Sequence, residues 1–113
     1  MTDTINLTIP SGARFRPVVT LVLSGIGTRM GLPYEQVDDL QLAVLSVLVA
    51  IDGETLTVTA KVDEQRLAVT VGPLVAGSSS DNGLLLVLER LVDRVDATAA
   101  EGQEWLTLGL DKL

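Results

Sequence analysis

Several residue types that carry chemistry in proteins are missing from this sequence or scarce in it. The 113 residues include no histidine and no cysteine. The absence of histidine removes the commonest general base and the commonest transition-metal ligand. The absence of cysteine excludes disulfide bonds and thiolate metal sites. Aromatic residues make up only 3% of the chain, so a core has to be built from Leu, Val, Ile and Ala.

Positive charge is also scarce. Eight Lys and Arg residues stand against 15 Asp and Glu residues, which gives a net charge of -7. Such a chain repels phosphate backbones and anionic lipid, so we expect a protein partner, with no nucleic acid and no membrane. No apolar run approaches the roughly 20 residues of a membrane-spanning helix. Residues 1–4 lack the basic and apolar regions of a secretory signal, so we expect a cytoplasmic protein.

The chain is long enough for one domain, residues 1–113, and its hydrophobic share of 47% allows a real core. Alternating and helical spacing of apolar residues predicts the elements. Strands are expected at 4–9, 55–62, 66–71, 95–99 and 104–110, and helices at 13–30, 34–51 and 84–92, the last of them with a cap at Asp81-Asn82-Gly83. The order β-α-α-β-β-α-β-β predicts an α+β fold, a two-layer α/β sandwich in which a mixed, mostly antiparallel sheet carries helices on one face.

The second predicted helix is apolar on almost every side. One stripe is formed by Leu40, Ala43, Val44, Val47 and Ile51, and the opposite side by Leu42, Leu45 and Val49. A helix of this kind is normally covered on more than one face. In the first helix, Gly25 and Gly27 are open to two interpretations, since they could fray the helix or allow close packing against a neighbour.

Three phrases of the sequence resemble a known family. They are SGIGTRMGLPYEQVDDLQLAV, NGLLLVLERLVDRVD and GQEWLTLGLDK, which together with the element order cover nearly the whole chain. They look like the small ATP-binding domain of the histidine-kinase-like ATPase (GHKL) family, and most like the anti-sigma-factor serine kinases of bacterial partner-switching systems. The resemblance implies that fold and an ATP site with Mg²⁺.

The positions that carry chemistry in that family are changed here. The resemblance implies a Glu and, four residues later, an Asn on the second helix, where this chain has Ser46 and Ala50. The Glu would position the attacking group and the Asn would hold Mg²⁺. Serine is no base without another group to activate it, and alanine offers a metal no oxygen. Shifting the alignment by two residues places Asp52 at the Asn position but Leu48 at the Glu position.

Two further motifs are altered in the same way. The Asp-x-Gly-x-Gly motif of the family would fall on Pro73, Val75 and Gly77, so only the last glycine remains. In the phosphate-binding Gly-Leu-Gly-Leu motif, Gly83 is kept and Leu85 replaces the second glycine, where it would crowd a phosphate. The lid loop between these motifs, residues 77–82, is short, and no Lys or Arg lies between Arg66 and Arg90.

These changes predict that the chain binds no nucleotide or metal, uses no cofactor and has no catalytic residue. We therefore expect a regulatory protein-binding domain that acts in transcription or signalling control. Its partner would be a sigma factor, an anti-sigma antagonist or another signalling protein, and a second copy of the chain could form a homodimer. The alternative is an active ATP-dependent anti-sigma serine/threonine kinase, and an unrelated α+β interaction domain is the third hypothesis.

Other residues keep two interpretations each. Ser46 could line a residual pocket or bond to the carbonyl four residues earlier, and Gly83 could bind an anion or belong to a helix cap. Trp105 could anchor a partner or be a half-buried sheet residue. Charged residues could mark contact sites or simply be solvated, namely Arg14, Arg16, Glu35, Asp38 and Asp39.

Overall fold

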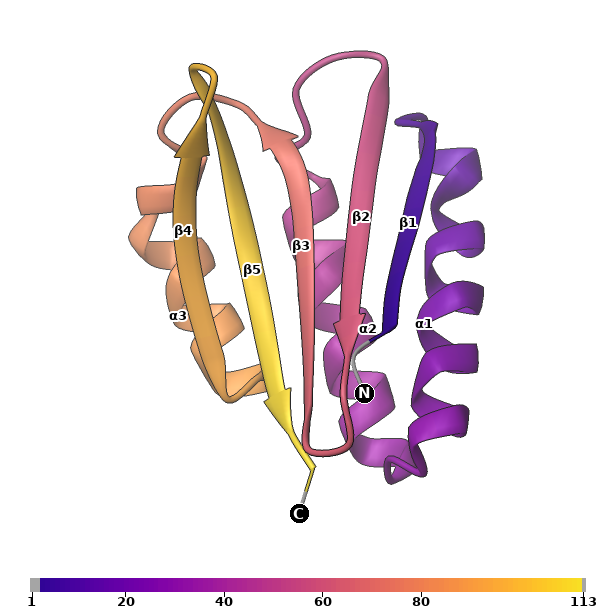
Figure 1. The fold of residues 1–113 in the computed structure, drawn as a ribbon. Coiled ribbons are helices and arrows are strands. Elements are labelled where there is room, and N and C mark those ends of the chain that lie inside the picture. Colours follow the sequence, from indigo (N-terminus) through magenta and orange to yellow (C-terminus); the bar gives the residue numbers. More distant parts are fainter. Residues whose placement is uncertain (1–2, 113) are drawn as a thin grey trace.

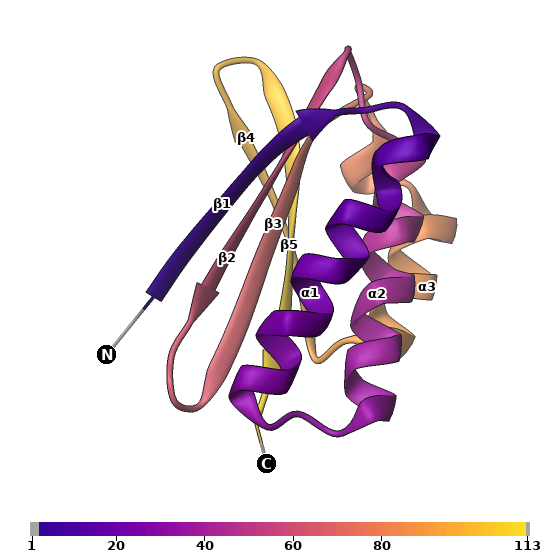
Figure 2. The same cartoon turned by 90° about the vertical axis from the view of Figure 1, so that its right-hand side faces the viewer.

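A computed structural model of the chain describes residues 3–112. Five strands form one sheet, and three helices cover one of its faces (Figures 1 and 2). The elements are β1 (Asp3–Pro10), α1 (Arg16–Met30), α2 (Tyr34–Leu48), β2 (Thr55–Val62), β3 (Arg66–Leu74), α3 (Asn82–Leu91), β4 (Arg94–Ala100) and β5 (Gln103–Asp111). The predicted element order and two-layer architecture are confirmed. None of the helices within residues 3–112 is long and apolar enough to cross a membrane.

The sheet has the order β1-β2-β3-β5-β4, and all four strand pairings are antiparallel. The prediction of a mixed sheet is thus refined, because no parallel pair occurs among the described strands. Strands β1 and β4 are the two edges of the sheet (Figure 1). Each edge strand has backbone groups on one side that no neighbouring strand pairs.

Alternation along the strands sorts residues between the two faces of the sheet. Residues such as Leu56, Val58 and Ala60 are buried under the helices, while the residues between them lie on the open face. Threonines on that open face bond across strands, as between Thr70 and Thr107 at 2.8 Å. A strand with one apolar and one polar face is typical of an antiparallel sheet that is covered on one side.

Helix α2 is the middle helix of the layer and lies between α1 and α3 (Figure 2). Its stripe at Leu40, Ala43, Val44 and Val47 is fully buried. On the outward side Leu42 remains 53% exposed. The helix is therefore covered by the sheet and by both neighbouring helices, as its composition predicted, but its outer side is open.

Two boundaries differ from the prediction at one end of the molecule. Helix α2 ends at Leu48, so Ile51 lies beyond it and pairs with Leu74 of β3 as an isolated bridge. Strand β3 in turn continues to Leu74 instead of ending at Val71. The physical reason is that backbone pairing with β3 competes with the helical hydrogen bonds: Asp52 N–H donates to Pro73 O at 2.9 Å. A third boundary differs at the start of α1. Residues 13–15, which were predicted to belong to this helix, form a separate 3-10 turn (Ala13–Phe15) before it.

The two glycines of α1 have different surroundings, which resolves the question they raised. The helix runs without interruption to a left-handed Gly31, so it does not fray. A Cβ atom at Gly27 would lie 2.5 Å from Val37 Cγ2 on α2, whereas one at Gly25 would meet no atom within 4 Å. Gly27 therefore allows the close approach of α1 and α2, and Gly25 has no such role.

Candidate functional site

The positions that the family resemblance singled out meet at one end of the molecule. The end of α2, the end of β3 and the start of α3 converge there. Val75 N–H donates to Ala50 O at 2.8 Å, which joins two of the predicted positions directly. Pro73 lies nearby, because its carbonyl oxygen accepts a hydrogen bond from the Asp52 N–H. Residues that are distant in the sequence are thus brought together where the resemblance implies a nucleotide site.

A small cavity of about 220 Å³ opens at this place. Its lining comes from Ser46, Val49, Ala50, Ser78, Asp81 and Leu84. Ser46 and Ala50 therefore share one cavity, as the prediction requires. The other five predicted positions do not line it, namely Pro73, Val75, Gly77, Gly83 and Leu85. Leu84 lines the cavity and Leu85 does not, although both side chains are partly buried against the core.

The Ser46 hydroxyl is already engaged. It donates to Leu42 O, four residues earlier, at 2.8 Å. This is the local bond that serines in apolar helices commonly make. The interpretation as a local hydrogen bond is therefore confirmed, and Ser46 also borders the cavity. Among the cavity-lining residues Asp81 carries the single carboxylate, and its Oδ1 already accepts a backbone N–H of α3.

Asp81 is the N-cap of α3, and it places a negative charge at the helix start. Its Oδ1 accepts the Leu84 N–H at 2.9 Å. A helix N-terminus attracts anions through its free N–H groups and its dipole, and here the chain supplies that anion itself. The cap predicted at residues 81–83 is confirmed. Gly83 lies inside the first turn, where an added Cβ would be 3.3 Å from Asp81 Oδ1.

A second carboxylate fixes the short loop before α3. Glu104, at the start of β5, accepts the N–H groups of Gly77 and Ser79 at 2.6 Å and 3.0 Å, and the Ser79 hydroxyl as well. The bond from the Ser79 hydroxyl, followed by the two backbone N–H bonds, holds the pKa of the Glu104 carboxyl below its ordinary 4.5. Sequence reasoning missed this residue, because the partners are 25 or more positions apart and share no motif.

The residues at this cavity do not fit ATP with Mg²⁺. Mg²⁺ requires oxygen ligands, and Ala50 provides only a methyl group at the position that the resemblance assigns to the metal. The Asp81 carboxylate occupies the helix start and would repel a phosphate group. Ligand pockets typically enclose about 300–1,000 Å³, which is more than the 220 Å³ found here.

Several of the remaining candidate residues have local explanations. Trp105 is half-buried on the open face of the sheet, where its ring lies 2.5 Å from the position of a Cβ at Gly72. The half-buried sheet residue was one of its two predicted interpretations. The Arg14 guanidinium lies 4.8 Å from the centre of the Phe15 ring. At the start of α2, Glu35 and Asp38 are exposed, which agrees with a solvated helix start.

Comparison with known proteins confirms the resemblance. No family model matches the chain. The serine-protein kinase RsbW of Listeria innocua is 36% identical over 97 residues, which is 79% of this chain and 57% of that protein. RsbW of Halalkalibacterium halodurans is 29% identical over 75 residues, or 61% and 46% of the two chains. RsbW of Bacillus pumilus is 40% identical over 42 residues, or 37% and 26%. The chain spans about half the length of the first two relatives.

Proposed function

The chain is a relative of the RsbW serine-protein kinases, and we propose that it is a regulatory protein-binding domain that does not bind or hydrolyse ATP. The observation that carries the proposal is the Asp81 carboxylate at the N-terminus of α3, in the same cavity as Ala50. A tetra-anionic nucleotide would meet a fixed negative charge, and Ala50 would offer no oxygen at the position that the resemblance assigns to the metal ligand. The domain, residues 1–113, would act in the cytoplasm on transcription or signalling control.

The outward surface of the helix layer supports a protein partner. Large apolar side chains are exposed on it at Leu21 (73%), Leu42 (53%), Val49 (73%) and Leu86 (56%). Exposed apolar residues gathered on one side of a small domain are typical of interaction surfaces. The partner would be a sigma factor, an anti-sigma antagonist or another signalling protein, and a second copy of the chain would also bury this surface.

Calorimetric titration with ATP and Mg²⁺ tests the nucleotide part of the proposal. We expect no heat of binding for the wild type. The variant Asp81→Asn is the matched control, since it keeps a capping oxygen but removes the charge, and we expect no binding there because Ala50 still offers no metal ligand. Micromolar binding by the wild type, with amide shifts at Ser46 and Ala50 in NMR spectra, would overturn the proposal.

The second candidate function is an active serine/threonine kinase, which the similarity to the RsbW serine-protein kinases favours. It requires a base near the phosphate, and Asp52 and Asp81 are the carboxylates closest in sequence to the predicted positions. Incubation with labelled ATP and partner proteins decides between the two. Phosphotransfer that is sustained by the wild type and abolished in Asp52→Asn or Asp81→Asn would establish the kinase.

A further inference from the structure

A larger cleft lies at the opposite end of the helix layer, between the sheet and α1. Its volume is about 670 Å³. Figure 2 shows the last turns of α1 diverging from the start of β1 and from the turn between β2 and β3. The lining comes from Asp3, Thr4, Ile5, Ile26, Arg29, Met30, Val62, Asp63, Glu64 and Lys112. None of these residues belongs to the small cavity beside Asp81.

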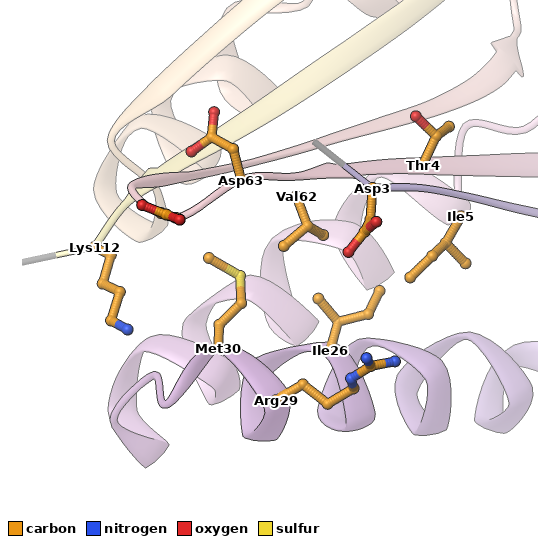
Figure 3. A pocket seen from close by; sticks show the side chains of 10 residues that line it. Asp3, Thr4, Ile5, Ile26, Arg29, Met30, Val62, Asp63 and Lys112 are labelled. Carbon is orange, nitrogen blue, oxygen red and sulfur yellow. The ribbon is translucent and has the colours of Figure 1, made fainter. Parts of the chain in front are cut away.

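The floor of this cleft is apolar and its rim is charged. Ile26 and Met30 from α1 face Val62 from β2 in the centre (Figure 3). Arg29 and Lys112 bring cations to the rim. The volume of the cleft lies within the range of about 300–1,000 Å³ that is usual for ligand pockets.

Apart from Asp63, the charged side chains at the rim of the cleft form no ion pair or hydrogen bond within the described part of the chain. The ion pairs of residues 3–112 join Arg66 and Arg94 to Asp111, so none involves Arg29 or Lys112. The acids of the rim are Asp3, Asp63 and Glu64. Asp63 is engaged locally, since its Oδ1 accepts the N–H groups of Gln65 and Arg66 at 2.8 Å and 2.7 Å. The rim can therefore pair with charges of both signs on a ligand.

The cleft also borders the free edge of β1. This strand pairs only with β2, so one row of its backbone groups lacks a strand partner. The Thr4 side chain points away from α1, whereas those of Asp3 and Ile5 point toward it (Figure 3). Thr4 therefore lines the cleft through its backbone. An exposed strand edge is a template for an added strand.

We propose that this cleft binds an extended segment of a partner protein, which pairs with β1 as a sixth strand. Alternate side chains of the segment would enter the apolar floor between Ile5 and Met30. Charged residues of both signs on either side of that apolar residue would pair with the rim at Arg29, Lys112, Asp3 and Glu64. Backbone pairing supplies affinity in this recognition mode, and the pocket for a side chain supplies specificity. The inference rests on the proposed function in treating the chain as a protein-binding domain.

The experiment selects short peptides from a random phage-displayed library on the wild-type protein and maps the enriched peptides by NMR. We expect amide shifts at Asp3, Thr4, Ile5, Arg29, Met30 and Lys112, and none at Ser46. Met30→Gln should weaken binding at least tenfold, since it places an amide in the apolar floor. Val18→Gln is the matched control: it changes an exposed apolar residue of the same helix outside the cleft, and it should leave affinity unchanged.

Methylated peptides test whether the bound segment pairs with the backbone of β1. Methylation of the peptide nitrogens that face β1 should abolish binding, whereas methylation of the nitrogens on the other side should not. Failure to enrich any peptide, shifts located elsewhere, or binding indifferent to methylation would overturn the proposal. Binding of octanoate without any peptide would overturn it too, because it would identify a small-molecule site. If the peptides fail while ATP still gives no heat, the nucleotide part of the proposed function stands and only the cleft assignment is lost.

Discussion

The two ends of the helix layer differ in what occupies their polar groups. Beside the small cavity, carboxylates of the chain itself bond the free N–H groups, with Asp81 on the start of α3 and Glu104 on the loop before it. At the cleft beside α1, the edge of β1 has no strand partner, and the cations Arg29 and Lys112 form no ion pair within residues 3–112. A site whose donors are satisfied internally has little to offer a ligand. The N–H groups named at the first end, here called the closed end, are bonded within the chain, whereas the edge of β1 and the two cations at the second, the open end, are not.

The largest effect is expected from Gly27→Val in α1, the helix that borders the open end. The added side chain would be forced against Val37, since a Cβ already lies 2.5 Å from its Cγ2. We expect a loss of about 1–3 kcal/mol in the free energy of unfolding, measured by urea denaturation.

Gly25→Ala is the control for that change. No atom lies within 4 Å of its Cβ, so the better helix propensity of alanine should stabilise the protein by about 0.5–1 kcal/mol. Changes of the same sign at the two positions would contradict the distinct roles given to these glycines.

A smaller effect is expected at the closed end from Asp81→Ala. Loss of the cap leaves the Leu84 N–H without its side-chain acceptor and should cost about 0.5–2 kcal/mol in urea denaturation. Asp81→Asn should retain most of the stability, because its amide oxygen can still accept. Equal losses in the two variants would show that the charge at the helix start matters more than the hydrogen bond.

The smallest effect is a pH dependence that arises from Glu104. Its folded pKa is lowered below the ordinary 4.5, so its contribution to stability is present above that value and is lost as pH falls through the folded pKa. Glu104→Gln should therefore flatten the acid limb of a stability–pH curve. Asp63, whose pKa is lowered by the Gln65 and Arg66 N–H groups, titrates in both proteins, so the difference between the curves isolates Glu104. Parallel curves would contradict the loop contact.

Much of the fold could be predicted because its signals are local. Alternation fixed the strands of the hairpins, and helical spacing fixed α1 and α3 to within a few residues. The cap at Asp81 was readable from neighbouring residues. The end of α2 was not, because residues 49–51 have helical sequence and the pairing of Ile51 with Leu74 overrides it.

For the candidate site, the sequence alone determined which side chains are present: no histidine anywhere, Ser46 and Ala50 where the resemblance implies Glu and Asn, and Pro73 where it implies Asp. Which side chains stand at these positions can be read without coordinates. The tertiary structure alone decided that Asp81 and Ala50 share a cavity, that Glu104 reaches the loop at Gly77, and that β1 borders a charged cleft. These contacts join residues far apart in the chain, and their distances depend on how the layers pack, which no local pattern encodes.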